Sequence, residues 1–261
     1  MKLVEVVDKR NCVYFLPMGD IHFGSFNSEI EKVKDFVKWA KQENAYVFLM
    51  GDIFDVATLE SQTSPFSQSM TLNEAIELAY EVFEPIKKQI IGAIIGNHEI
   101  RLMKYAGFDI MQNFCRILEI NYCGYSAVIR FRVGKKNRKK EGYDSPKIEY
   151  VFYAHHTTAG GNTIGGKINR IEKLRQIFEG ADCYLGGHNH FEGCGKVVVG
   201  YLSKSGNGKA IIKYKKIYFV DTGSFLNYDN SYAEEKMLMP ATIGCPRIRM
   251  DGIKKDLHIS E

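Results

Sequence analysis

Residues 90–99 read IIGAIIGNHE, an apolar run of strand length that passes directly into Gly, Asn, His and Glu. The same order recurs along the chain, because four other apolar segments also end in short polar clusters that contain Asp or His. These clusters are GDIH at 19–22, GDIFD at 51–55, HH at 155–156 and GGHNH at 186–190. Open α/β sheets bind their ligands at the carboxyl ends of strands, so this pattern predicts a site built from strand ends.

The first half of the sequence alternates strands with helices, whereas the second half is mostly strands. Apolar residues repeat at helical spacing after 28 and after 71, and each segment opens with a capping-box pattern, Ser28 with Glu31 and Thr71 with Glu74. Further helices are predicted near 107–118 and 167–178. The remaining strand candidates are 120–133, 147–154, 195–202, 209–214 and 216–222. No repeat or linker interrupts this mixed α/β pattern, so we expect a single domain over residues 1–261.

The composition is that of an ordinary globular protein, with 45% hydrophobic and 25% charged residues in 261. These values exclude disordered, collagen-like and coiled-coil chains. The net charge of +4 permits a nucleic-acid partner without requiring one. The six cysteines form no C-x-x-C pair, no apolar run is long enough to span a bilayer, and the N-terminal residues lack the apolar stretch of a signal peptide. We therefore expect a cytoplasmic protein with reduced thiols and no membrane partner.

The polar clusters carry the donors of a metal site. Six of the seven histidines lie in them, and the Asp-x-His and His-x-His spacings point paired side chains the same way on an extended segment. Carboxylate and imidazole donors without thiolate suit Mn²⁺, Fe or Zn²⁺. Seven donors are too many for one tetrahedral ion but suit two ions that share a carboxylate. The candidates are Asp20, His22, Asp52, Asn97, one of His155 and His156, His188 and His190.

Several of these residues also have simpler interpretations. Asp52 and Asn97 could each cap a helix, although the surrounding histidines favour the ligand role. His155 is favoured over His156 as the ligand because it is the first residue after the strand, which leaves His156 beside the site or at the substrate. Arg101 could contact phosphate or lie on the surface. The basic run 135–140 could bind a nucleic-acid backbone or form a solvated loop.

The ordered blocks D-x-H, G-D, G-N-H-E, H and G-H-x-H, from residue 19 to residue 190, resemble the calcineurin-like metallophosphoesterase superfamily. The resemblance implies a four-layer αββα sandwich, in which two mixed β-sheets are flanked by helices. It also implies the ligands of two metal ions. These are Asp20, His22, Asp52 and His190 for the first ion, and Asp52, Asn97, His155 and His188 for the second. By the same resemblance, His98 contacts the phosphate and protonates or stabilises the leaving oxygen, and Asp55 orients His98.

Two metal ions can stabilise the attacking and leaving oxygens at phosphorus and can generate hydroxide from bound water at neutral pH. We therefore expect a phosphoesterase that uses a metal-bound hydroxide, with Mn²⁺ favoured over Fe or Zn²⁺. Val56 follows Asp55 and Ile95 precedes Gly96, so the arginines typical of protein Ser/Thr phosphatases are missing. This favours a phosphodiesterase or nuclease acting on nucleotides or nucleic acids. The alternatives are a phosphomonoesterase on small molecules or phosphoproteins, and a non-catalytic metal-binding scaffold or nucleic-acid-binding module.

Overall fold

The computed structural model describes residues 1–58, 68–135, 148–158, 161, 163–235, 237 and 239–260. The strands are β1 Lys2–Asp8, β2 Cys12–Met18, β3 Tyr46–Leu49, β4 Ile90–Ala93, β5 Ser126–Val133, β6 Ile148–His155, β7 Cys183–Gly186, β8 Glu192–Lys204, β9 Ala210–Thr222, β10 Arg247–Asp251 and β11 Leu257–Ser260. The helices are α1 Ile30–Glu43, α2 Leu72–Phe83, α3 Asn97–Ala106, α4 Ile110–Leu118, α5 Ile164–Glu172 and α6 Tyr232–Glu235, with short 3₁₀ helices at η2 Glu84–Ile86 and η3 Lys173–Gln176.

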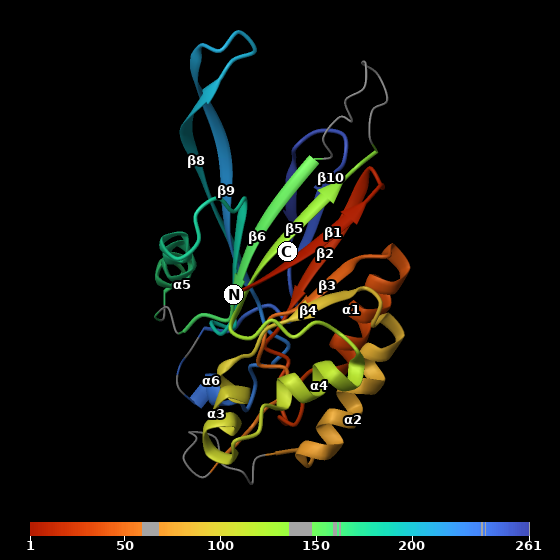
Figure 1. The fold of residues 1–261 in the computed structure, drawn as a ribbon. Coiled ribbons are helices and arrows are strands. Elements are labelled where there is room, and N and C mark those ends of the chain that lie inside the picture. Colours follow the sequence, from red (N-terminus) through yellow and green to blue (C-terminus); the bar gives the residue numbers. More distant parts are fainter. Residues whose placement is uncertain are drawn as a thin grey trace.

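These strands form two mixed sheets with helices outside them, so the predicted fold class is confirmed (Figure 1). The six-stranded sheet has the order β1-β5-β6-β7-β9-β8, and the five-stranded sheet has the order β11-β10-β2-β3-β4. Strands β2, β3 and β4 run parallel to one another, as do β6, β7 and β9. Each parallel set therefore brings the carboxyl ends of its strands to one edge of its sheet.

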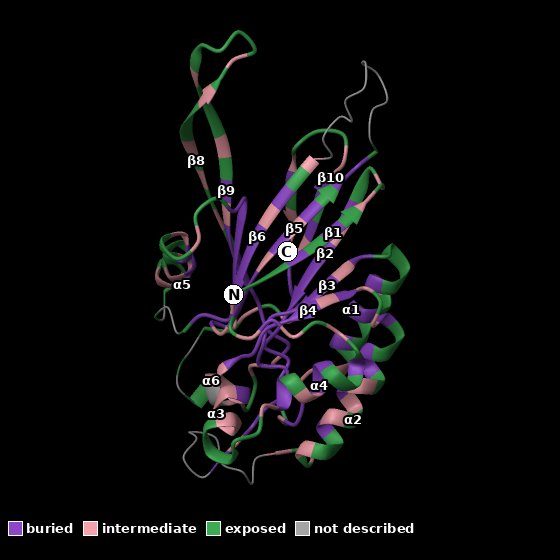
Figure 2. Cartoon of the chain, in the orientation of Figure 1, coloured by how far each residue is buried: buried purple, intermediate pink, exposed green. Residues whose placement is uncertain are grey.

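Three apolar clusters separate the layers, and the two-residue period of the strands assigns side chains to them. In β3, Val47 and Leu49 pack in the cluster that contains residues of α1, α2 and α4, whereas Phe48 packs between the two sheets. In β7, Leu185 also lies between the sheets, and Tyr184 packs in the cluster that contains Ile171 of α5. In Figure 2, buried residues are purple and lie along most of the strands between the layers.

The helix boundaries bear out some of the sequence patterns and correct others. Thr71 and Glu74 form the predicted capping box of α2, and the helix gives way to a 3₁₀ turn one residue before Pro85. The predicted box at Ser28 is wrong: α1 begins at Ile30, and the Ser28 hydroxyl donates instead to the Ile21 carbonyl at 2.7 Å.

Five helices and strands were not predicted: β1, α3, α6, β10 and β11. The strands β1 and β11 lie at the edges of their sheets, where only one side is hydrogen-bonded and burial is weak. Glu99 is the single fully buried side chain that the structure describes in α3, so this helix lacks the apolar stripe that marks α1 and α2 in the sequence.

Candidate metal centre

The polar clusters meet where the strands β2, β3, β4, β6 and β7 end, as the sequence predicts. Five residues of these loops have a left-handed backbone that side-chain-bearing residues rarely adopt, with φ between 47° and 75°. They are Asp20, His22, Asp52, His188 and His190. Such conformations cost free energy and concentrate at functional sites, because the surrounding structure holds the side chains in a required direction.

The first group of donors consists of Asp20, His22 and His190. Asp20 and His22 are buried, and His190 is partly exposed. The Nε2 atom of His190 lies 3.2 Å from Asp20 Oδ1 and 3.3 Å from Nε2 of His22. Two ring nitrogens that face each other at this distance can share a proton or turn their lone pairs to one cation.

The second group consists of Asp52, His156 and His188, with Asn97 beside them. His156 Nε2 lies 3.1 Å from Asp52 Oδ2, and Asn97 Oδ1 lies 3.0 Å from His156 Nε2 and 2.5 Å from His188 Nδ1. Asn97 is the first residue of α3, and Gly96 occupies the cap position. The Asn97 amide is therefore directed at the two histidines, and the cap interpretation does not hold.

Asp52 lies between the two groups. Its Oδ2 atom is buried without a hydrogen-bond partner, 3.9 Å from Nε2 of His22 and of His98 and 3.1 Å from that of His156. Burial without compensation is costly for a carboxylate oxygen. A cation on each side of Oδ2 would supply the missing interaction, and the oxygen and nitrogen donors around it have the chemistry that divalent transition metals prefer. The residues present thus fit a pair of metal ions.

The electrostatics of the cluster also favour cation binding. Burial alone would lower the pKa of His156, but the carboxylates of Asp52 and Asp20 outweigh it and raise that pKa to about 10. The pKa of Asp52 is held well below its usual value because the surrounding histidines outweigh its burial. The carboxylates therefore create a field that attracts positive charge, either protons on the histidines or metal cations.

The structure places His156, and not His155, in the donor cluster, which corrects the expectation from strand position. His155 is the last residue of β6, and its Nδ1 accepts a hydrogen bond from Thr157 N at 2.7 Å. His156 Nδ1 lies 2.9 Å from the Met50 carbonyl, so its N–H donates there and Nε2 is turned to Asp52. Successive strand residues point to opposite faces, and the even positions of β6 face the other sheet.

His98 and Asp55 form the pair that the sequence suggested for proton transfer. His98 Nδ1 lies 2.7 Å from Asp55 Oδ1, and Gln68 Nε2 donates to the other carboxylate oxygen at 2.9 Å. Burial opposes protonation of His98, but the charges of Asp52 and Asp55 raise its pKa above the usual value. Burial likewise opposes ionisation of Asp55, but His22 and His98 hold its pKa far below the usual range. His98 also belongs to a donor group with His22 and Asp52, so its geometry allows either role.

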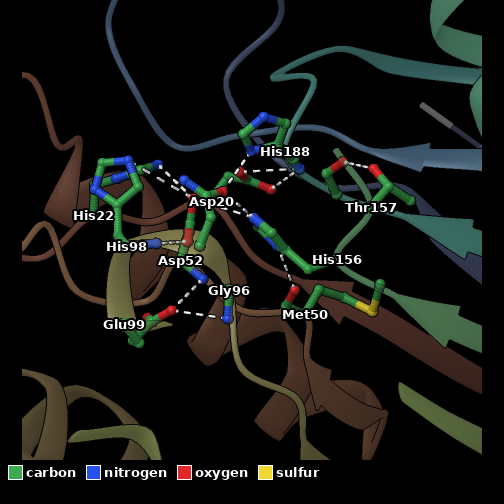
Figure 3. A network of polar contacts seen from close by, with 12 residues as sticks. Asp20, His22, Met50, Asp52, Gly96, His98, Glu99, His156, Thr157 and His188 are labelled. Carbon is green, nitrogen blue, oxygen red and sulfur yellow. Dashed lines mark hydrogen bonds and ion pairs between the residues drawn. The ribbon is translucent and has the colours of Figure 1, made fainter. Parts of the chain in front are cut away.

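The sequence analysis assigned no role to Glu99, which is fully buried and binds two loops of the site. Its carboxylate accepts hydrogen bonds from the backbone N–H groups of Asp52, Ile53, Phe54 and Gly96 at 2.6–3.0 Å. Figure 3 shows Glu99 with Asp52 and Gly96. Burial and the neighbouring Asp52 raise the pKa of Glu99 to about 7. The sequence could have indicated this role through the position of Glu99 as the third residue of a helix, where a carboxylate reaches back to free backbone N–H groups.

Asp221 and Lys167 are two further residues without a sequence-based role, and both support the loop between His188 and His190. Asn189 Nδ2 donates to the buried Asp221 at 2.8 Å, and Lys167 Nζ donates to the Asn189 carbonyl at 2.9 Å. These contacts fix the backbone between the two histidines, one of which lies in each donor group.

The other predicted contacts lie at the margin of the site or outside the described residues. Arg101 Nη1 donates to the Val56 carbonyl at 2.8 Å, which ties α3 to the loop after Asp55. Of the basic run 135–140, the structure describes Lys135 alone, which is exposed. No helix in the described part of the chain is long and apolar enough to cross a membrane.

The Asp, His and Asn donors at the strand ends form a candidate metal site. Residues 14–192 match the family of calcineurin-like phosphoesterases, so the chain belongs to that family, whose members bind a dinuclear metal centre. No curated protein matches the sequence. The structure is similar to that of GAP50, the anchor in the inner membrane complex of Plasmodium, with a TM-score of 0.45 and 12% identity over 97% of this chain and 90% of that chain.

Proposed function

We propose that this protein is a phosphodiesterase that hydrolyses nucleotide or nucleic-acid diesters with two divalent cations, Mn²⁺ being favoured. The observation that carries the metal-dependent activity is the position of Asp52, whose Oδ2 is buried, accepts no hydrogen bond and lies between two groups of donors. In this proposal one cation binds to Asp20, His22, Asp52 and His190, and the other binds to Asp52, Asn97, His156 and His188.

When bound, the two cations would acidify a water molecule and stabilise charge on the oxygens of the reacting phosphate. His98 would donate a proton to the leaving oxygen from Nε2, because Nδ1 faces Asp55. Asp55 is a positioning residue, which keeps the imidazole ring in the required orientation and favours its protonated form. Glu99 would hold the loops that carry Asp52 and Asn97.

A diester is proposed over a monoester because of the charge that the site must accept. A monoester carries up to two negative charges and a diester carries one. The positions where protein phosphatases place arginines hold Val56 and Ile95 here, and the guanidinium of Arg101 is bonded to a backbone carbonyl. The nucleotide or nucleic-acid part of the proposal is supported by the basic run at residues 135–140 of the sequence.

The test compares hydrolysis of bis-(p-nitrophenyl) phosphate, p-nitrophenyl phosphate and the p-nitrophenyl ester of thymidine 5′-monophosphate. Each would be measured with metal-stripped protein and after addition of Mn²⁺, and with Asp52→Asn as the inactive control. We expect Mn²⁺-dependent activity, with kcat/KM highest for the nucleotide diester. A higher kcat/KM for the monoester would establish the phosphomonoesterase alternative. Two bound ions without hydrolysis of any of the three would establish the scaffold alternative.

We also propose that residues 1–261 act as one domain in a reducing compartment such as the cytoplasm. One apolar cluster contains residues from both sheets, which supports a single folding unit. The six cysteines, all of which the structure describes, form no disulfide, and Cys12 is exposed, which supports reducing conditions.

A further inference from the structure

The hairpin of β8 and β9 extends well beyond the rest of its sheet. Its strands have 13 residues each and pair from Glu192 with Thr222 to Lys204 with Ala210. The base is built into the protein, because Ile217 and Phe219 are buried and Val197 packs against them. Beyond that point the two strands project as an isolated ribbon with mostly exposed residues (Figures 1 and 2).

One face of the projecting ribbon carries an apolar stretch that lies between Lys204 and Lys216. Residues paired across the strands share a face, so Leu202 lies beside Ile212, and Tyr214 lies opposite Gly200. The ring of Tyr214 and the side chain of Ile212 both approach the space above Gly200. Val198 continues the same face, and the exposed fractions of these side chains are 60% for Val198, 78% for Leu202, 65% for Ile212 and 72% for Tyr214. Contiguous exposed apolar residues of this kind mark an interaction surface.

The same ribbon is strongly basic. Residues 196–216 contain six lysines and no acidic residue, namely Lys196, Lys204, Lys209, Lys213, Lys215 and Lys216. The chain as a whole has 35 basic and 31 acidic residues, so the part outside this segment has 29 basic and 31 acidic ones. The positive charge of the protein is thus concentrated on the element that also exposes the apolar face.

We propose that the β8–β9 hairpin, defined by residues 196–216, docks onto the surface of an anionic lipid bilayer. The lysines require a partner with dense negative charge, and the aliphatic side chains require an apolar medium. A bilayer offers both, with headgroup phosphates above the acyl chains. A nucleic acid would satisfy the lysines and could stack on Tyr214, but it offers nothing that would bury Leu202 and Ile212. A second copy of the hairpin would bring twelve lysines together.

The geometry leaves the metal centre accessible in this arrangement. His190 lies just before β8, and β9 ends at Thr222 beside the site, whereas the turn 205–208 lies at the far end of both strands. Thirteen residues of strand correspond to about 40 Å. The turn is closed by the hydrogen bond from Ser205 N to the Lys209 carbonyl at 2.8 Å. A bilayer that receives the tip would therefore lie far from the site.

The experiment measures sedimentation of the full chain with vesicles of phosphatidylcholine alone and of phosphatidylcholine with phosphatidylserine at about 7:3. We expect binding to the anionic vesicles alone, weakened by salt. Changing Lys204, Lys209 and Lys213 to Gln should reduce the affinity about 100-fold, from roughly fivefold per lysine. Leu202→Ser with Ile212→Ser should reduce it about tenfold or more without changing the net charge.

Matched controls use residues of similar exposure outside the hairpin. Changing Lys32, Lys38 and Lys41 of α1 to Gln, or Ile177 and Ile253 to Ser, should leave the affinity within about twofold. Circular dichroism and the thermal midpoint of each variant would confirm folding. A Leu202→Trp variant adds a direct probe, since its emission should shift to the blue and be quenched by brominated acyl chains.

Any one of four results would overturn the proposal. The first would be that the wild-type chain does not bind anionic vesicles. The second would be that the α1 control variant loses as much affinity as the hairpin lysine variant. The third would be that the hairpin substitutions weaken binding to single-stranded oligothymidylate more than binding to vesicles, because the surface would then be a nucleic-acid site. The fourth would be self-association of the protein in sedimentation without lipid that Leu202→Ser abolishes, because the hairpin surface would then be an interface between copies of this chain.

Discussion

The Nδ1 atom of His98 lies 2.7 Å from the carboxylate of Asp55, so the other ring nitrogen is turned to the cluster of metal-binding candidates. The two roles that this position leaves open for His98, metal ligand and acid, differ in what the Nε2 atom carries. A ligand would bring its lone pair to a cation, whereas an acid must carry a proton, and the Asp55 carboxylate favours the protonated ring.

His98→Ala should therefore keep the metal content of the wild type while kcat falls by about 10²–10⁴-fold. The loss should be largest for substrates with alkoxide leaving groups and small for p-nitrophenolate, which scarcely needs a proton. Asp55→Asn should give a smaller loss of the same kind. Metal analysis together with kcat for two leaving groups checks this. A missing ion in His98→Ala, or equal losses for both leaving groups, would rule out the acid role.

Asp52→Asn should weaken the binding of both cations, because Oδ2 of Asp52 lies between the two donor groups. Titration of metal-stripped protein with Mn²⁺ in a calorimeter measures this directly. Gln68→Ala is the control, since its contact is with Asp55 and it should leave both binding steps intact. If Asp52→Asn still binds one ion with wild-type affinity, the carboxylate is not shared.

The neighbouring histidines 155 and 156 form a matched pair for metal content. His156→Ala should lose one of the two ions, because His156 Nε2 points at Asp52 and Asn97. His155→Ala should keep both, because the side chain of His155 is bonded to Thr157 N. Elemental analysis of the two purified variants decides between them, and the opposite result would restore the order expected from the sequence.

Glu99→Ala should destabilise the metal-free protein by about 3–5 kcal/mol, because four buried N–H groups lose their acceptor. Urea unfolding of metal-stripped protein measures the free energy without a contribution from metal binding. Glu31→Ala serves as the control, since its carboxylate is exposed in the first turn of α1 and should cost less than about 1 kcal/mol. A loss below about 1 kcal/mol for Glu99→Ala would show that water replaces the carboxylate.

Asp8 gives a pH-dependent contribution to stability far from the site. Its carboxylate accepts hydrogen bonds from Arg10 and Tyr46 at 2.7–3.0 Å, and these outweigh burial and lower its pKa. A lowered pKa stabilises the fold above the unfolded value of about 3.9, and this contribution is lost as the pH falls through the folded value.

Asp8→Asn should therefore cost about 2 kcal/mol at pH 7 and progressively less below about pH 4. Urea unfolding at pH 7 and at acid pH provides the comparison. Asp35→Asn, exposed on α1, should change the free energy of unfolding by less than about 0.5 kcal/mol at either pH. If Asp8→Asn lowers the free energy of unfolding by the same amount at every pH, the packing of the Asp8 side chain, and not its charge, stabilises the fold.

Local sequence determined the strand ends and the identity of the donors. Apolar runs followed by GD, GNHE and GGHNH predicted where β3, β4 and β7 stop and which side chains follow them. These features depend on a few consecutive residues, because side-chain alternation and capping act over one or two turns. The edge strand β1 and the helix α3 escaped prediction because their burial patterns are weak.

Tertiary structure alone decided between His155 and His156 and revealed Glu99. Which of two adjacent histidines faces the metal cluster depends on which face of β6 is covered by the opposite sheet, and no local pattern records that pairing. Glu99 acquires its function from backbone N–H groups more than 40 positions away in the sequence, at Asp52, Ile53 and Phe54. Short local motifs therefore supply the chemical groups of this site, whereas its geometry arises from contacts between segments that are distant along the chain.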